Sequence, residues 1–380
     1  MLDAKIALIY LGFVFLASII AIEFDITAGI VEIIAGAILV NTIGTESIPW
    51  FEFIATFGGI VLAFLAGSEV DSRTLRSNFK KCSIIGGVAF LLPFVLGFSL
   101  AYFIAGWGIE ASKIAAVTLA PSSFAVVYVV LVETGIIKTP LGKIIMTSTF
   151  ISDLLTVIAI TFMFSQFNIY TSLFLVASIG IIFFIPKLIR VFFKRYGDRV
   201  MEPEIKFLFF IFFVLIFLGI ISKSQPILPA FILGFAMADF FAENRTISRK
   251  LRTVGFAFIT PFFFMKGGMN IDVASLLSNW PVLVAFFLVL VLSKAIGVGS
   301  LWRILPSGGK MFTTLLMSTG SITFSTIALL FGYESGYLDK AQFSVLITSV
   351  LLSAVVLSVF AQRMFMPKEE IIEKDKAIVV

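Results

Sequence analysis

The sequence predicts an all-α membrane protein that crosses the bilayer many times. Of its 380 residues, 59% are hydrophobic and only 13% are charged, and the mean hydropathy is +1.10. Soluble domains carry about 25% charged residues. Apolar stretches of about 20 residues, long enough to cross a bilayer as helices, recur along the whole chain. Because lipid offers no partners for backbone groups, such stretches indicate helices that satisfy their own hydrogen bonds.

Thirteen stretches qualify as spans when turn residues and clustered charges are taken as boundaries. The connections are short, so we expect one transmembrane domain over residues 1–362 and a cytoplasmic tail over residues 363–380. The predicted spans are residues 6–22, 28–43, 51–68, 82–105, 113–132, 142–165, 170–188, 205–222, 227–241, 253–268, 281–302, 310–332 and 342–362.

Basic residues are distributed unevenly over the predicted loops. When the loop at residues 68–82 is placed in the cytoplasm, 22 lysines and arginines fall on the inner side and four on the outer side. Basic residues concentrate in cytoplasmic loops of membrane proteins. We therefore expect the cell membrane as the location, with the N-terminus outside and the C-terminus inside. The net charge of +5 is explained in this way without a nucleic-acid partner.

The composition excludes several kinds of chemistry. The chain has no histidine and a single cysteine, Cys82. It therefore lacks His-dependent catalytic triads, His-ligated zinc and a disulfide framework. Proton chemistry must use carboxylates or lysines, and we expect no cofactor and no metal beyond a transported monovalent cation. No Ser-Lys, paired-Asp or metal-ligand group indicates an enzyme.

Two predicted spans, 113–132 and 310–332, are interrupted at their centres. Proline breaks a helix, and small polar residues can satisfy the backbone groups that are freed. A simple kink is the alternative in each case. Since the two spans are seven apart in order, they run in opposite directions, which predicts an inverted repeat of spans 4–6 and 11–13 with two crossing helices at a midplane site. The interrupting residues are Pro121, Ser122 and Ser123 in one span and Ser318, Thr319, Gly320 and Ser321 in the other.

Asp153 is the first candidate for a functional residue. It is the only ionisable side chain after Lys143 in the apolar run from Leu141 to Phe164. A carboxylate at mid-membrane costs roughly 2.5 to 3.5 kcal/mol, so it indicates a function. Ser152 precedes it and Thr149 lies four residues back on the same helical face, which predicts a small oxygen cage around a desolvated cation.

Lys294 is the matching basic candidate, because it lies deep in an uncharged stretch that opens the second repeat. Broken helices leave partial charges of about half a unit at each end, so a crossing requires an acid and a base nearby. Asp153 and Lys294 are the available pair, although a lysine can instead snorkel to the membrane surface.

Three further ionisable residues lie near span ends. For Lys266 we expect snorkelling or a loop contact. Glu32 and Glu69 lie toward the inner ends of their spans, where we expect solvated or helix-capping carboxylates; alternatively they line a cytoplasmic funnel that attracts cations.

Several segments in order along the chain resemble the monovalent cation:proton antiporter-2 family. Members commonly show a Ser/Thr-rich broken helix, an acidic-Gly turn, and then an acidic residue in an aliphatic span. The matching segments are IVEIIAGAILVNTIG, FLAGSEVDSRTLR, TLAPSSFAVVYVVLVETGIIKTPLGKIIMTSTFISDLLTVIAI, PFFFMKGGMNID, SKAIGV and MSTGSITFSTIALLFG.

The resemblance implies a homodimer in which a core domain moves against a dimerisation domain. It implies that Asp153 is the essential residue that binds the cation or the proton, and that Lys294 is the core lysine. Ser122, Ser123 and Thr149 would supply supporting oxygens. Many relatives have Asp or Asn immediately before the essential Asp, whereas this chain has Ser152. The implied core comprises residues 82–165 and 281–362, the scaffold residues 6–68 and 205–268, and a linker helix residues 170–188.

These observations predict a Na⁺- or K⁺-for-H⁺ antiporter in which cation and proton compete for Asp153. Two alternatives remain open at this point. A sodium-coupled organic-anion symporter has a similar crossed-helix architecture but requires a roomier polar core. A channel-like potassium-efflux protein would show single-channel currents.

Overall fold

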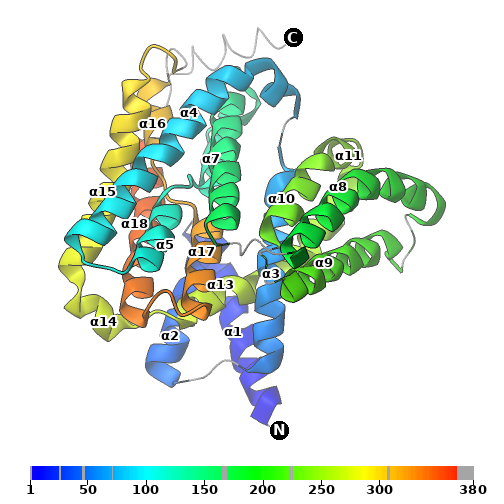
Figure 1. The fold of residues 1–380 in the computed structure, drawn as a ribbon, viewed down its shortest axis with the longest axis horizontal. Helices are drawn as coiled ribbons and strands as arrows, with labels where there is room; N and C mark the ends of the chain where they lie inside the picture. Colours follow the sequence, from blue (N-terminus) through cyan, green and yellow to red (C-terminus); the bar gives the residue numbers. More distant parts are fainter. Residues whose placement is uncertain are drawn as a thin grey trace. The chain divides into compact units, whose positions relative to one another are not determined.

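The computed structural model describes residues 2–24, 27–44, 48–70, 72–164, 169–197, 199, 201–222, 224, 226–305 and 309–365 (Figure 1). Apart from one isolated bridge, these residues contain no β-structure. In chain order the helical elements are α1 (Leu2–Glu23), α2 (Ala28–Ile38), η1 (Leu39–Ile43), α3 (Pro49–Ser68), α4 (Ser72–Ser99), η2 (Leu100–Ile104), α5 (Ile109–Leu119), α6 (Phe124–Glu133), η3 (Ile136–Lys138), α7 (Pro140–Phe164), α8 (Ile169–Tyr196), α9 (Pro203–Ser222), α10 (Ile227–Ala236), α11 (Ala238–Glu243), α12 (Arg245–Val254), η4 (Gly255–Ile259), α13 (Thr260–Met269), α14 (Val273–Ser278), α15 (Trp280–Ser300), α16 (Lys310–Met317), α17 (Ile322–Glu334) and α18 (Lys340–Phe365).

Eight helices among the described residues are long and apolar enough to cross a membrane, namely α1, α3, α4, α7, α8, α9, α15 and α18. Three shorter apolar helical stretches occur at Ala28–Ile43, Ile227–Ala236 and Ile322–Glu334. Each of the thirteen predicted spans contains helix in the structure. The short helices α12 and α14 were not predicted, because neither is long or apolar enough to register as a span.

The chain divides into two compact units. The first comprises Met1–Ile48, Arg73–Thr156 and Phe264–Val380, and the second comprises Pro49–Ser72 and Val157–Phe263. Two of the four unit boundaries therefore fall inside α7 and inside α13, and the other two fall at the start of α3 and after the first residue of α4. The predicted scaffold stretch 6–68 is split between the units, and the predicted linker helix lies in the second unit.

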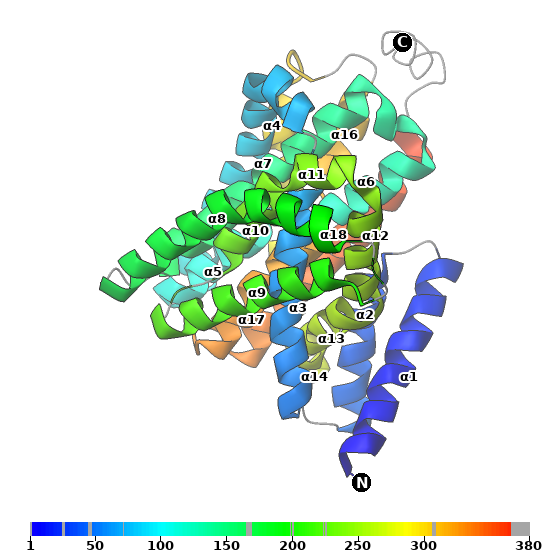
Figure 2. The same cartoon turned by 90° about the vertical axis from the view of Figure 1, so that its right-hand side faces the viewer.

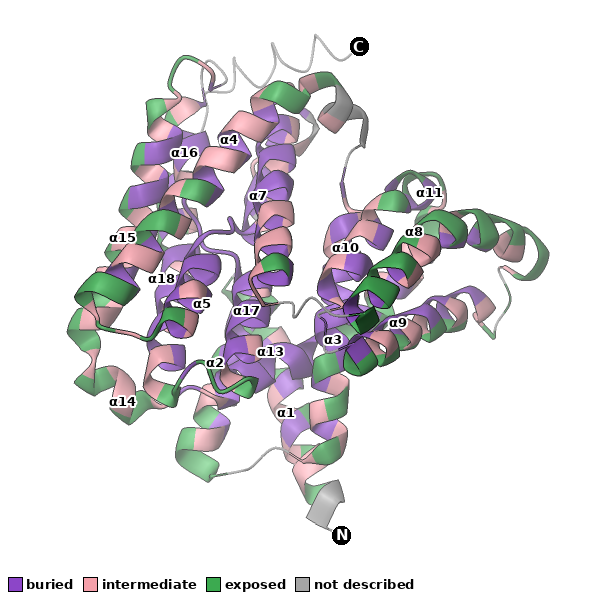
Figure 3. Ribbon diagram, in the orientation of Figure 1, coloured by how far each residue is buried: buried purple, intermediate pink, exposed green. Residues whose placement is uncertain are grey.

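Small residues let helices of the first unit approach closely, as is common between helices in membranes. A Cβ atom on Gly36 of α2 would collide with the carbonyl oxygen of Met265, and one on Gly268 of α13 would collide with that of Ile33. The helices α1 and α2 also lie side by side (Figure 2). Among the eight long apolar helices, α7 is the most buried, with 72% of its most apolar stretch inside the protein (Figure 3).

In the second unit, α3 packs against α10 and α8 packs against α9. Gly67 and Gly234 permit the first contact, because a Cβ on either would collide with the carbonyl oxygen of a phenylalanine on the partner helix. Aromatic rings fill the space between α3 and α9; Phe57 and Phe213 stack with their centroids 4.6 Å apart. This unit is therefore held mainly by close backbone approach and ring packing.

Candidate functional site

The first helix break separates α5 from α6 at residues 120–123. Pro121 has no backbone N–H to donate, so the helix cannot continue through it without loss of a hydrogen bond. The Ser123 hydroxyl accepts a hydrogen bond from the Val126 N–H at 3.3 Å and so satisfies a donor at the start of α6. The sequence thus ends one helix and begins the next within four residues.

The second break separates α16 from α17 at residues 318–321. The Ser321 hydroxyl caps α17 by accepting from the Phe324 N–H at 3.4 Å. At the end of α16, the hydroxyls of Ser318 and Thr319 donate to carbonyls of the preceding turn at 2.7 Å each. Both new helix ends are therefore satisfied by the small polar residues that interrupt the span.

The two breaks contact each other directly. Ser122 and Gly320 form an antiparallel bridge. On either side of it, the Ser123 N–H donates to the Thr319 carbonyl at 3.3 Å and the Ser321 N–H donates to the Pro121 carbonyl at 3.1 Å. The Ser122 hydroxyl also donates to the Met317 carbonyl at 2.6 Å. The extended segments thus satisfy each other's backbone groups, which lipid could not do.

Lys294 of α15 is fully buried and bonded to both breaks. Its Nζ donates to the Pro121 carbonyl at 2.5 Å and lies 3.3 Å from the Thr319 carbonyl. These carbonyls follow the C-terminal ends of α5 and α16, where helix dipoles leave partial negative charge. The snorkelling alternative is wrong for Lys294, because its ammonium is bonded inside the protein.

Asp153 lies on α7 with 1% of its surface exposed. Its Oδ1 atom is buried and makes no hydrogen bond to any group that the structure describes. The charges of Asp153 and Lys294 interact, although none of the described ion pairs joins them. A buried carboxylate oxygen without a donor is rare, because the unmet desolvation cost is large.

The predicted supporting hydroxyls are buried, and they have partners. The Ser152 hydroxyl accepts from the Ser122 N–H at 3.3 Å, which joins α7 to the first break. The Thr149 hydroxyl donates to the Ile145 carbonyl at 3.0 Å and lies 3.3 Å from the Met317 sulfur. Ser152 and Thr149 therefore connect α7 to the crossing. To bind a cation, each hydroxyl would have to give up one of these contacts.

Two serines that sequence analysis did not single out also hold the crossing. The Ser353 hydroxyl of α18 accepts from the Gly320 N–H at 3.0 Å, and the Ser325 hydroxyl of α17 donates to the Thr118 carbonyl at 2.5 Å. A Cβ atom on Gly320 would lie 2.8 Å from the Ser353 hydroxyl, so this glycine is required by a close approach. The spacing of Ser349 and Ser353 on one helical face of an apolar span could have indicated a buried polar contact.

Replacing Ser353 with alanine is expected to destabilise the crossing, because the buried Gly320 N–H loses its acceptor. The expected loss is about 1 to 3 kcal/mol in the free energy of unfolding. A lower midpoint temperature of thermal unfolding in detergent would show it. Ser358→Ala is the matched control, because this hydroxyl of the same helix donates to Val355, three residues before it. Equal midpoints for the two variants would contradict the prediction.

The other ionisable candidates lie elsewhere. Glu32 is 4% exposed, so the expectation of a solvated carboxylate is wrong. Glu69 forms an ion pair with Arg252 at 3.2 Å. The cytoplasmic funnel at these two carboxylates stays a prediction. Lys266, for which snorkelling or a loop contact was expected, is 7% exposed and forms an ion pair with Glu334, a residue that sequence analysis missed.

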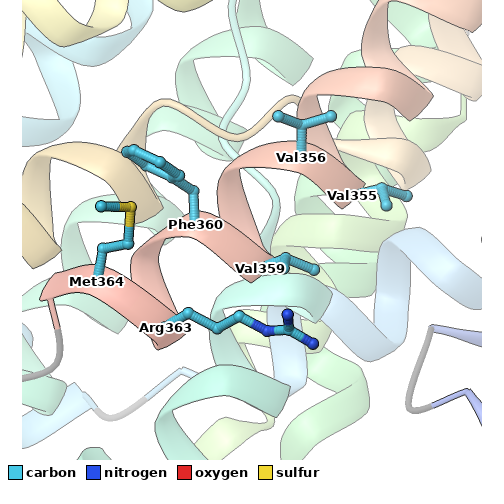
Figure 4. Close-up of a pocket in the computed structure, with 6 residues that line it drawn as sticks. All are labelled: Val355, Val356, Val359, Phe360, Arg363 and Met364. Atoms are coloured by element: carbon cyan, nitrogen blue, oxygen red, sulfur yellow. The ribbon is translucent and has the colours of Figure 1, made fainter.

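A surface groove of about 440 Å³ runs along the C-terminal part of α18 (Figure 4). All its lining residues project from this one helix, and none belongs to the crossing. Its walls are almost entirely apolar, as suits a helix surface in contact with lipid. The lining residues are Val355, Val356, Val359, Phe360, Arg363 and Met364.

A helical membrane protein with a buried acid and a buried base at two crossing broken helices has the architecture of a secondary ion transporter. The chain belongs to the sodium/hydrogen exchanger family, because the model of that family's transmembrane domain matches residues 10–366. It is therefore a multi-pass membrane protein of the cation/proton antiporter class and not an enzyme. The resemblance inferred from the sequence is confirmed at this level.

Individual relatives agree with this assignment. The chain is 30% identical to the probable Na⁺/H⁺ antiporter 3 of Methanocaldococcus jannaschii, over 95% of this chain and 96% of the relative. It is 22% identical to the Na⁺/H⁺-K⁺ antiporter GerN of Bacillus cereus, over 96% and 98% of the two chains. Its fold is similar to that of the sodium proton antiporter MjNhaP1 from Methanocaldococcus jannaschii, with a TM-score of 0.70 at 14% identity over 96% of this chain and all of the other. The all-helical, multi-span fold class is thereby confirmed.

Proposed function

We propose that this protein exchanges Na⁺ or K⁺ for protons across the cell membrane by alternating access, and that cation and proton compete for Asp153. The observation that carries the proposal is the unpartnered Oδ1 of this carboxylate, which is buried among the helices of the crossing. A hydrogen-bonded or solvated carboxylate would have no comparable need for a positive partner.

Competition at one carboxylate is sufficient for exchange. A bare charge is costly in a medium of low dielectric constant, so the loaded site crosses readily only when Asp153 is neutralised. A proton and a monovalent cation each neutralise it, and the two exclude each other. Lys294 keeps its ammonium on the carbonyls of Pro121 and Thr319, where it offsets the partial negative charge at the ends of α5 and α16.

Supporting oxygens for the cation would come from the residues around the crossing. Ser122, Ser123, Ser152 and Thr149 are all buried. Their hydroxyls can exchange present contacts for a cation at small cost, because a hydroxyl rotates about its C–O bond and can both donate and accept. Cage size and carbonyl placement would then select among Na⁺, K⁺ and Li⁺.

We further propose thirteen spans with two inverted repeats, an external N-terminus and a cytoplasmic C-terminus. In support, the break between α5 and α6 lies between the long helices α4 and α7, and the break between α16 and α17 lies between α15 and α18. The proposed core, residues 82–165 and 281–362, would carry the site. In a homodimer formed through the scaffold helices, the two scaffolds would stay in place while the core of each protomer moves.

The test uses purified protein in proteoliposomes that contain a pH-sensitive dye. Inward gradients of Na⁺, K⁺ and Li⁺ are applied in turn across a series of pH values. We expect saturable proton efflux with Na⁺ or K⁺, as the names of the two antiporters that the chain resembles suggest. Uptake of organic anions, or unitary currents in planar bilayers, would instead support the symporter or channel alternatives.

The exchange is expected to show little response to membrane potential. Ser152 stands where a second acid would allow a second proton to bind, so one proton should leave for each cation that enters. Such a cycle moves no net charge and therefore does no work against the voltage. The measurement compares initial rates with and without an imposed potential at fixed ion gradients. Rates that rise in proportion to the voltage would contradict the prediction.

A further inference from the structure

A second charged pair lies within the first unit, outside the cation site. The ammonium of Lys266 on α13 forms an ion pair with the carboxylate of Glu334, the last residue of α17. The lysine side chain is 9% exposed and the glutamate side chain 51% exposed. One partner is thus largely desolvated, so removal of the carboxylate would leave a buried ammonium with less compensation for its charge.

The α13 segment that carries Lys266 is packed tightly against two neighbours. A Cβ atom on Gly267 would lie 2.9 Å from the Thr326 side chain of α17, and one on Gly268 would collide with the Ile33 carbonyl of α2. The Asn270 side chain also donates to the Lys266 carbonyl at 3.1 Å. These contacts hold the backbone of α13 at Lys266, from which the side chain reaches Glu334.

The other end of α17 belongs to the crossing. Its N-cap residue Ser321 donates its backbone N–H to the Pro121 carbonyl, and its first full turn holds Ser325, whose hydroxyl bonds to α5. A helix of 13 residues is about 20 Å long. Because a helix behaves as a rigid rod over this length, a charge that fixes Glu334 also restrains the direction in which α17 leaves the crossing.

The helix α13 has one more property that bears on transport. Its first residues, 260–263, belong to the second unit, and the residues from Phe264 onward belong to the first. In the second unit Phe262 contacts Phe51 of α3 with ring centroids 5.7 Å apart. The backbone of α13 thus passes from one unit into the other, and Lys266 is the point at which this helix forms an ion pair with α17.

We propose that Lys266 and Glu334 form a positioning pair that couples α13 to the outer half of the broken helix and thereby sets the rate of the conformational step. The pair does not contact the cation; it acts through α17. The proposal rests on the exchange activity proposed above, but not on which carboxylate binds the cation.

The test measures antiport in proteoliposomes for Lys266→Met, Glu334→Gln and the charge-swapped double variant Lys266→Glu/Glu334→Lys. We expect each single variant to lower the maximal rate about tenfold and to leave the half-saturating cation concentration within about twofold. The double variant should recover most of the lost rate, because the two side chains again carry opposite charges, with the acid and the base exchanged between the two positions. Rates are expressed per folded protein, as determined by size-exclusion chromatography.

Lys113→Met is the matched control, because Lys113 forms a comparable ion pair with Glu110 at 2.8 Å within α5 itself. It should transport at the wild-type rate. Glu334→Gln keeps the proposal testable if Lys266→Met fails to fold, since Glu334 is half-exposed. Wild-type maximal rates in Glu334→Gln, or no recovery in the double variant, would overturn the proposal. Asp153→Asn, assayed in parallel, reports separately on the cation site.

Discussion

Replacing Asp153 with asparagine is expected to abolish cation-driven proton movement, with a fall in rate of at least about 100-fold. Asparagine has nearly the same shape, so the buried position can be filled, but it can neither bind a proton nor neutralise a cation. Without an acid that binds the proton, cation movement is no longer coupled to proton movement, and a 100-fold fall in rate corresponds to about 2.7 kcal/mol in activation free energy. Dye fluorescence in proteoliposomes measures the loss.

Asp272→Asn is the matched control for this experiment. Asp272 caps α14 at the protein surface, and hydrogen bonds from Ser275 hold the pKa of its carboxyl below the usual range. The control therefore removes a carboxylate that is charged at neutral pH, while asparagine remains a good helix cap. It should transport normally. If Asp153→Asn kept cation-driven proton movement near the wild-type rate, the proposed competition at this residue would be wrong.

Replacing Lys294 with methionine is expected to have the second-largest effect and to reduce both stability and transport. The carbonyls of Pro121 and Thr319 lose their charged donor, and Asp153 loses the charge that compensates it. Removing one partner of a buried charged pair costs roughly 3 to 5 kcal/mol. Thermal unfolding in detergent measures the first effect, and the proteoliposome assay measures the second.

A double-variant comparison separates the two causes of that instability. If the unbalanced carboxylate contributes, Lys294→Met/Asp153→Asn should be more stable than Lys294→Met alone, because no uncompensated charge then remains. Lys113→Met again provides the same substitution at a more exposed lysine. A Lys294→Met protein with wild-type stability would show that the crossing does not depend on this ammonium.

Local chemistry explains why much of this protein could be predicted from its sequence. In lipid each span must satisfy its own backbone hydrogen bonds, so the spans and the two interruptions follow from nearby residues alone. Asp153 and Lys294 were recognisable for the same reason, because an ionisable residue is conspicuous in an apolar stretch. The family resemblance rested on such segments, and the family match over residues 10–366 agrees with it.

Contacts between distant residues could not be predicted in this way. Gly320 and Ser353 meet although 33 residues separate them, and Lys266 and Glu334 meet across 68 residues. The same sequence pattern allows a serine or a lysine to face lipid, a neighbouring helix or its own backbone. The burial of Glu32 and the present hydrogen bonds of Ser152 and Thr149 depend likewise on which helix lies alongside.

The sequence by itself therefore determined that the chain is a helical membrane protein with two broken spans, and that Asp153 and Lys294 each lie inside an otherwise uncharged stretch. Only the tertiary structure decided that the two breaks bond to each other, that Lys294 lies on their carbonyls, and that one oxygen of Asp153 is left without a partner. The physical reason is that helix formation in lipid depends on neighbours along the chain, whereas satisfaction of buried polar atoms depends on neighbours in space.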